Sequence, residues 1–507
     1  MSGKAYKALL SAIAALLLVG VSFIQSALVR EREQLGLNPY TELRGAPPVL
    51  ALTTVALGGF RGLISNFLWM RATELQEQNK YFEMVQLADW ITKLEPHFTQ
   101  VWLMQGWNMA FNISVEFDNP ADRWRWVERG MELMRDDGLH YNPYNVLLHR
   151  ELAWLFEFKM GGNMDDSQMY YKRAWATEMY KIFKSDRPNW DELINPQTDD
   201  ARQRATLLRD KYKLDAKLMK QVDDKYGPLE WRLPEAHAIY WAVQGLQMAE
   251  KNEQRIDPDD LVTLRRVIYQ SMHLAFQRGR LVTVDLGTNV ERVVDLGPNL
   301  NIIPNANKAY EDAIHEEKEG KFHDGLLNAH RYFLLDVVFF LYMNGREADA
   351  NQWYLYLADK YPDKRVLNDK PESLPRVTPM MEYVLGRTEE EVHTLGEYKT
   401  RYMLEGLERQ AFMSLALDEK GQKAKMLDDL AQQIWSRYQE KIGNIGSTNA
   451  ASRLYVAPLD DIRSDVLRQM LSGELPPELT LRLAAKTGQT NLPPTQPNAP
   501  PPAPRPN

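Results

Sequence analysis

Equivalent positions recur 34 residues apart in this 507-residue chain. Leu68 and Trp102 are separated by this number of residues, and so are Ala72 and Gly106. Such a period is typical of stacked helix-turn-helix repeats, in which each repeat buries its apolar face against its neighbours. The chain also exceeds the ~250 to 300 residues at which single cores stop growing. We therefore expect an extended array of paired helices.

The repeat between residues 68 and 96 shows the pattern most clearly. Its turn falls at residues 79–81, and Pro96 closes its second helix because proline lacks a backbone N–H. Small residues at the helix contacts let the paired helices approach closely. The positions that we expect to pack between helices are Leu68, Ala72, Tyr81, Ala88, Pro96, Trp102, Gly106, Trp241, Gly245, Gly345, Ala350, Tyr354 and Pro362.

These offsets resemble those of the tetratricopeptide (TPR) repeat, closely over residues 60–120 and in patches over residues 234–362. The stretches GGFRGLISNFLWMRA, YFEMVQLADWITKLEP and WRLPEAHAIYWA are similar to those of uncharacterised bacterial envelope proteins with such repeats. The resemblance implies an all-α fold, a degenerate TPR-like array or α-solenoid. It implies no activity.

An apolar run of 22 residues, 8–29, precedes the repeats, and a bilayer core needs ~20 such residues as helix. Lys4 and Lys7 come before it, as in a signal sequence or an uncleaved anchor. We favour the anchor, because the run exceeds a signal core and only Gly20-Val21-Ser22 offers a weak cleavage site. The expected location is the bacterial inner membrane, single-pass, with the main domain periplasmic.

The remaining organisation follows from breaks in the helical pattern. LVTVDLG and ERVVDLG alternate in a valine-rich pattern bounded by glycines, which predicts a β-hairpin at 280–298. Eight of the last sixteen residues are proline, which predicts a disordered tail. The expected parts are a tail 1–7, the anchor 8–29, a linker 30–48, helical regions 49–225, 226–365 and 366–485, and a Pro-rich tail 486–507. The apolar stretch 49–60 is too short to span and is expected to be a buried or interfacial helix.

Charge and cysteine content exclude several functions. The chain has 61 basic and 69 acidic residues, a net charge of −8, and no basic stripe interleaved with aromatic residues. Nucleic acid is therefore not an expected partner. Cysteine is absent, which removes disulfides, thiol nucleophiles and sulfur-ligated metal sites. We expect no metal and no cofactor, and the sequence identifies no small-molecule ligand.

Few residues point to catalysis. Glu235 and His237, in WRLPEAHAIYWA, could act as an acid-base pair, but a helix that begins at Pro234 with a packed histidine explains them better. Glu151 lies among apolar residues and is expected to form a structural ion pair with Arg150 or a nearby tyrosine. The histidines of HEEKEGKFHDGLLNAH do not follow a zinc-hydrolase pattern, and we interpret this stretch as a solvated helical hairpin. Aspartates before apolar helices are interpreted as caps.

Six tryptophans, at 102, 107, 124, 126, 154 and 175, could line a groove, although helical spacing predicts that most are core. We therefore expect a membrane-anchored scaffold with protein partners and no enzymatic activity. One alternative is a carrier for a lipid or glycan in the aromatic groove. Another is a hydrolase that uses Glu235 and His237.

Overall fold

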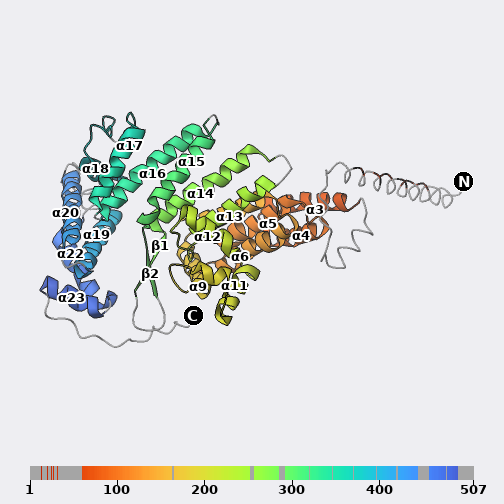
Figure 1. Ribbon diagram of the computed structural model, residues 1–507, viewed down its shortest axis with the longest axis horizontal. Helices are drawn as coiled ribbons and strands as arrows, with labels where there is room; N and C mark the ends of the chain where they lie inside the picture. The colour runs from red at the N-terminus through yellow and green to blue at the C-terminus, as the bar shows by residue number, and fades with distance from the viewer. Residues whose placement is uncertain are drawn as a thin grey trace. The chain divides into compact units, whose positions relative to one another are not determined.

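The computed structural model describes most of the chain after residue 60 (Figure 1). The described ranges are 60–162, 165–251, 256–284, 292–318, 320–344, 346–368, 370–394, 397–417, 421–443, 456–475 and 477–488, with residues 13, 17, 20, 24, 27 and 31 before them. The described part is predominantly helical, as predicted. Internal contacts divide the chain into a first unit, Met1–Ala275, and a second unit, Phe276–Asn507.

From residue 60 onward, the described residues of the first unit form helices joined by turns. Three of its segments, η1, η3 and η4, are π-helical continuations of the helices before them. In chain order the elements are α3 (Phe60–Glu77), α4 (Tyr81–Leu94), α5 (Thr99–Trp107), η1 (Asn108–Ile113), η2 (Ser114–Glu116), α6 (Pro120–Glu132), η3 (Leu133–Gly138), α7 (Leu139–Tyr141), α8 (Val146–Trp154), η4 (Leu155–Met160), α9 (Gln168–Phe183), α10 (Trp190–Ile194), α11 (Asp199–Asp210), α12 (Ala216–Tyr226), α13 (Pro234–Lys251) and α14 (Pro258–Arg278).

The turn between α3 and α4 forms where the sequence predicted it. Asn79 has a φ of 58°, a left-handed conformation that asparagine tolerates. The N–H of Asn79 donates to the Gln76 carbonyl, and the N–H of Lys80 donates to the Leu75 carbonyl at 2.9 Å. These two bonds satisfy carbonyls that the end of α3 would otherwise leave free. The chain therefore reverses here, and α4 packs back against α3.

The next turn connects α4 to α5 around Pro96. The helix α4 ends at Leu94, and the Pro96 carbonyl accepts hydrogen bonds from Trp102 Nε1 and from Asn142 Nδ2, both at 2.9 Å. One carbonyl thus ties this turn to two later segments of the chain. Ala88, Ile91 and Val101 form a buried apolar cluster beside it.

The second unit begins within α14 and contains the only sheet among the described residues. Strands β1 (Arg280–Val284) and β2 (Arg292–Gly297) pair antiparallel, which confirms the predicted β-hairpin. The helices that follow are η5 (Leu300–Ile302), α15 (Ile303–Glu316), α16 (His323–Met343), α17 (Glu347–Lys360), α18 (Met380–Thr394), α19 (Glu397–Leu417), α20 (Gln422–Gly443), α22 (Leu459–Gln469), η6 (Met470–Glu474) and α23 (Pro477–Thr487). The last helices, from α19 onward, share one apolar cluster.

Several predicted segments fall outside the described residues. Within the predicted anchor, residues 13, 17, 20, 24 and 27 are helical and exposed, and the remainder of 8–29 is not described. The linker apart from residue 31, the apolar stretch up to residue 59 and the tail beyond residue 488 also lie outside the described part. Among the described helices, only α16 is long and apolar enough to cross a membrane, and 56% of its apolar window is buried. Such burial is typical of a core helix.

Candidate binding surface

Four aromatic rings from two separate helices form a continuous stack in the first unit. Trp107 ends α5 and Phe111 follows in η1, whereas Trp154 ends α8 and Phe158 follows in η4. The members of each pair are four residues apart, and their rings stack on each other. We refer to these four side chains as the aromatic column.

The rings of the aromatic column lie nearly parallel. The ring centroids of Trp107 and Phe111 are 5.2 Å apart with planes at 21°, and those of Trp154 and Phe158 are 4.8 Å apart at 10°. Phe111 and Trp154 join the two pairs at 5.1 Å and 30°. Stacking of this kind stabilises the arrangement, in addition to the stabilisation that comes from burying apolar area. The column therefore also fastens the α5 segment to the α8 segment.

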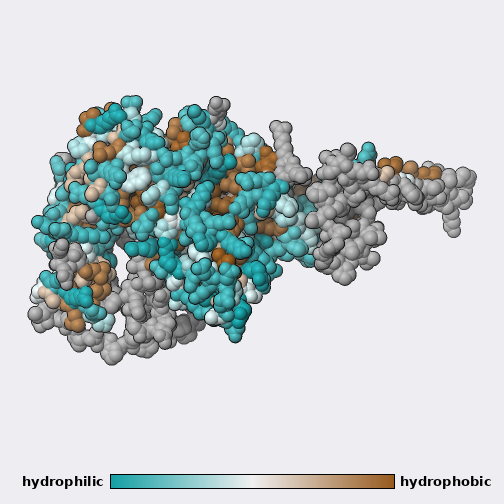
Figure 2. Space-filling model, viewed as in Figure 1, coloured by the Kyte–Doolittle hydropathy of each residue, from teal (hydrophilic) through white to brown (hydrophobic). Residues whose placement is uncertain are grey.

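Both ends of the column are open. Trp107 is 38% exposed and Phe158 is 37% exposed, and the two inner rings are partly buried. Because neighbouring rings cover each other, only ring edges and the outer faces of the end rings are accessible. On the face of the molecule visible in Figure 2, hydrophobic residues form small groups on a mainly hydrophilic surface.

A buried ion pair, Lys159 with Asp165, lies against the Phe111 ring of the column. Lys159 Nζ lies 5.1 Å from the Phe111 ring centroid and 2.5 Å from Asp165 Oδ2, and the lysine side chain is 4% exposed. Burial lowers the pKa of the Lys159 ammonium, although Asp165 opposes this shift. Asp165 also accepts from the Ser167 N–H at 2.8 Å and from Arg123 at 3.5 Å. The aspartates before α9 were predicted to cap it, but the N-cap residue is Ser167, and Asp165 instead holds this ion pair in the turn before the helix.

The same π-helical segment contains a buried acid. Glu157 is 6% exposed, and among the described residues its Oε2 has no hydrogen-bond partner. Burial raises the pKa of Glu157 to about 8, while the charge of Arg266 acts in the opposite direction. The carboxyl is therefore mostly protonated at neutral pH. Ionisation of Glu157 should therefore make the stability of the packing beside the column depend on pH.

The candidate catalytic pair lies inside the core. The helix α13 begins at Pro234, as predicted, and His237 is 0% exposed. Its Nε2 donates to the Trp231 carbonyl at 2.9 Å, and its ring lies against Phe156 and Trp175, with centroids 5.5 Å and 4.9 Å away. Burial lowers the pKa of His237 to about 4. Glu235 is 1% exposed.

The other candidate residues have structural contacts. Glu151 accepts from Arg150 Nη2 at 2.8 Å, and Arg150 also donates to Asp260 at 2.7 Å. His330 is buried between Tyr361 and Asn307, which contact its Nδ1 at 2.7 Å and its Nε2 at 2.8 Å. In the part of the chain that the structure describes, no group of three or more His, Asp or Glu side chains could hold a metal ion.

The positions predicted to pack between helices are mostly interior. Those that are buried are Ala72, Ala88, Pro96, Trp102, Gly106, Trp241, Gly245, Ala350 and Tyr354, and those that are half-buried are Leu68, Tyr81 and Pro362. Gly345 lies outside the described residues. Of the six tryptophans, those at 102, 124 and 175 are buried, and those at 107, 126 and 154 remain partly exposed.

Phe111 and Phe158 were missed by the sequence reasoning. A signal for both was present, because WNMAF at 107–111 and WLFEF at 154–158 share a tryptophan followed four residues later by phenylalanine. The pattern gives no hint that the two pairs meet, since their contact depends on how α5 packs against α8.

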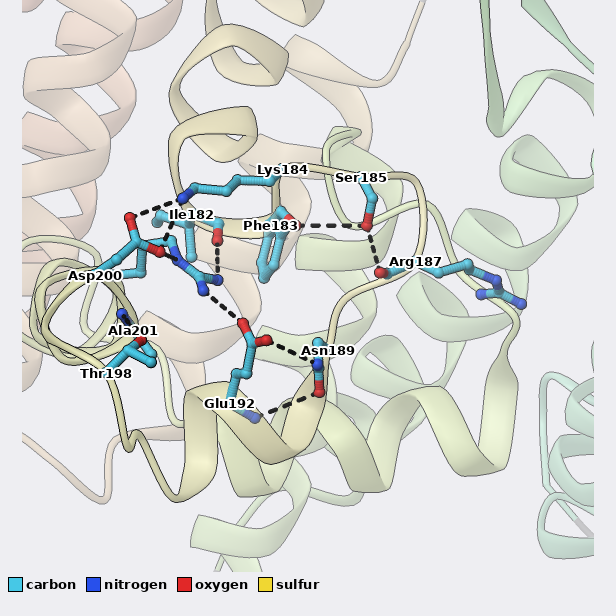
Figure 3. A network of polar contacts seen from close by, with 11 residues as sticks. Ile182, Phe183, Lys184, Ser185, Arg187, Asn189, Glu192, Thr198, Asp200 and Ala201 are labelled. Carbon is cyan, nitrogen blue, oxygen red and sulfur yellow. Dashed lines mark hydrogen bonds and ion pairs between the residues drawn. The ribbon is translucent and has the colours of Figure 1, made fainter.

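A second polar cluster joins α9, α10 and α11 (Figure 3). Arg204 donates to the Ile182 carbonyl at 3.0 Å, to Glu192 at 2.6 Å and to Asp200 at 2.8 Å. Lys184 donates to the same Asp200 at 2.7 Å. Arg204, Lys184, Glu192 and Asp200 all have partners within the cluster, which indicates a structural role for this network.

No protein-family model matches the chain, and neither a curated protein nor a solved structure matches it.

Proposed function

We propose that this chain is a single-pass protein of the bacterial inner membrane whose TPR-like helical array holds partner proteins on the periplasmic side. The observation that carries the proposal is the aromatic column, with its two open ends at Trp107 and Phe158. Rigid aromatic side chains supply contact area at interfaces at a low cost in conformational entropy, and they are enriched where binding energy concentrates.

The geometry favours a protein partner over a glycan. Sugar rings stack on open aromatic faces, but the inner faces of this column are covered by neighbouring rings. Exposed edges and two outer faces suit the apolar side chains of an amphipathic helix, which bind with i, i+3 and i+4 spacing. The partner expected here is therefore a helical segment with an apolar stripe.

The same geometry argues against a hydrolase. A general base must come within ~3 Å of the proton that it removes, directly or through one water. His237 is 0% exposed and its ring is enclosed by Phe156, Trp175 and Trp231. Glu235 is 1% exposed on the same helix. A substrate could reach this pair only after the core opened.

Site-specific photocrosslinking of the full-length protein in its native membranes tests the proposal. A photoreactive phenylalanine analogue would replace Trp107 in one variant and Tyr180 in another, because Tyr180 on α9 is 40% exposed and lies outside the column. We expect discrete protein adducts from position 107 that position 180 does not give. Adding Phe158→Ala should reduce these adducts without changing the circular dichroism spectrum.

The outcomes separate the alternatives. Identical adducts from the two positions would refute the column as the docking site, and adducts of lipid alone would favour the carrier. A parallel fractionation with residues 1–30 removed tests the anchor. Full-length chain that remains in the soluble fraction would overturn the membrane location.

A further inference from the structure

A cleft of about 340 Å³ lies within the second unit. It is lined by residues from the end of α16, the beginning of α17 and α18, and the first half of α20. The lining side chains include Tyr342, Glu347, Met381, Lys425, Met426 and Asp429. The cleft is distant in sequence from the aromatic column and belongs to a different unit.

Part of the cleft lining is apolar and polarisable. Tyr342 is 5% exposed, and its hydroxyl donates to Met381 Sδ at 3.0 Å. Met426 is half-buried beside the same cleft. Methionine side chains are unbranched and flexible, so they adapt to the shape of an alkyl chain. This surface suits a chain of methylene groups.

Charged side chains also line the cleft. Glu347 and Asp429 are exposed, and within the described residues neither carboxylate has a hydrogen-bond or ion-pair partner. Burial raises the pKa of the Tyr342 hydroxyl, and the charges of Glu347 and Asp429 raise it further. Lys425 is the one basic residue that lines the cleft. Two acids and one base leave the cleft negative.

Some other acids of the same unit have ion-pair partners. Glu311 accepts from Lys360 at 2.8 Å, and Asp349 accepts from Arg346 at 2.6 Å. Glu347 and Asp429 line the same cleft as Met381 and Met426, so a ligand that carries both a cation and an alkyl chain could contact both kinds of side chain. Ammonium-carboxylate hydrogen bonds are about twice as strong as neutral ones.

We propose that this cleft binds a primary alkylammonium group, as presented by a lysine side chain of a partner polypeptide. The alkyl chain lies along Met381 and Met426, as lysine side chains commonly do on apolar surfaces, and the ammonium lies between Glu347 and Asp429. A free diamine has the same chemistry. This site is additional to the aromatic column, and its existence does not depend on the scaffold proposal.

Methyl NMR of the full-length protein in nanodiscs tests the site. The methionine methyls would carry ¹³C, with Met381 and Met426 assigned by substitution to leucine. The probes are cadaverine, the peptide acetyl-Ala-Lys-Ala-amide, and the same peptide with norleucine in place of lysine. We expect saturable shifts of both methyls with the first two probes and at least tenfold weaker binding of the norleucine peptide.

Charge-neutral variants provide the control. Glu347→Gln combined with Asp429→Asn should weaken binding of the lysine peptide at least tenfold. Glu372→Gln combined with Glu440→Gln removes the same number of charges from exposed positions outside the cleft and should leave binding unchanged.

Each result bears on the proposal. Tighter binding of the peptide than of cadaverine supports a polypeptide source, and the reverse result supports a free amine. Norleucine binding as tight as lysine binding, equal losses in the two double variants, or shifts that do not saturate would overturn the alkylammonium site.

Discussion

Gly130 lies directly against the backbone of Gly106: a Cβ atom added to Gly130 would come 2.6 Å from the Gly106 carbonyl oxygen. The same Cβ would also lie 3.3 Å from the Cβ of Met109 and 3.4 Å from the Cβ of Ala110. The helices α5 and α6 therefore approach so closely at this point that no side chain fits between them. The column residue Trp107 immediately follows one of these glycines in the chain.

This contact predicts that Gly130→Ala destabilises the first unit by ~1 to 3 kcal/mol, as overpacking does. The cost arises because a carbonyl oxygen cannot move aside without shifting its helix. Gly106→Ala should cost less, since the atoms nearest to a Cβ there belong to the flexible side chain of Met134, with its Cγ at 2.6 Å, and not to backbone. Thermal denaturation monitored by circular dichroism measures both effects.

Gly406→Ala is the matched control for this series. Gly406 lies inside α19, and a Cβ there would meet nothing within 4 Å. Alanine is favoured over glycine inside a helix by ~0.5 to 1 kcal/mol, so this variant should be slightly stabilised. A Gly130→Ala protein as stable as the wild type would show that the two helices do not approach in this way.

Much of the helical pairing could be predicted because it depends on local signals. The turn at Asn79, the helix end before Pro96 and the start of α13 at Pro234 all follow from how these residue types restrict the backbone. The hairpin of β1 and β2 follows in the same way from valine alternation between glycines. The small residues Ala72 and Ala88 were found from spacing alone.

The aromatic column could not be predicted in full, because it depends on tertiary packing. Trp107 and Trp154 were candidates, but helical spacing could not separate them from the buried Trp102 and Trp175. The two partner phenylalanines lie in π-helical segments, where the period departs from 3.6 residues per turn and helix-face arguments fail. The cleft of the second unit involves four helices and has no local signal.

The buried acid Glu157 predicts a fall in stability with rising pH. Its folded pKa of about 8 lies above the ordinary 4.5, so between these values the unfolded chain releases the proton while the folded chain keeps it. The resulting loss of folding stability is absent below about pH 4.5 and complete above about pH 8. Relative to wild type, Glu157→Gln should become progressively more stable from pH 5 to 8.5.

Melting temperatures of the first unit across this range test that prediction. Glu116→Gln serves as the control, because Glu116 is exposed on the same unit. A difference between Glu157→Gln and wild type that stays constant with pH would mean that Glu157 ionises normally in the folded protein.

The buried His237 predicts that the stability of the fold decreases as the pH is lowered. Its folded pKa of about 4 lies below the ordinary 6.5, so stability is lost as pH falls through this interval and the unfolded chain binds the proton. His237→Phe should be less stable than wild type at pH 7, because the Trp231 carbonyl loses its donor. Its stability should nevertheless fall less steeply between pH 6.5 and 4.

Urea denaturation at a series of pH values measures this slope. His97→Gln changes an exposed histidine and should reproduce the wild-type slope. His149 and His330 are also buried with pKa values lowered to about 4, so part of the acid sensitivity will remain in His237→Phe. An unchanged slope in that variant would contradict a neutral, buried His237.

The Arg204 network predicts that one backbone contact matters more than the ion pairs around it. Glu192 and Asp200 have side chains that are 48% and 56% exposed, and exposed ion pairs contribute little, ~0 to 1 kcal/mol. The Ile182 carbonyl is different, because its hydrogen bond from Arg204 Nη1 is buried. Removing that donor leaves a buried acceptor unsatisfied, which costs ~1 to 3 kcal/mol.

Arg204→Met should therefore destabilise the first unit by ~1 to 3 kcal/mol, whereas Glu192→Gln should cost less than ~1 kcal/mol. Methionine keeps most of the apolar contact of the arginine stem, so the loss reports the missing donor. In the double variant, Glu192→Gln should add little to Arg204→Met, because its partner is already gone. Equal losses for the two single variants would instead assign the stability of this segment to the ion pairs. The helices α9, α10 and α11 would then be held together mainly by charge and would loosen in high salt.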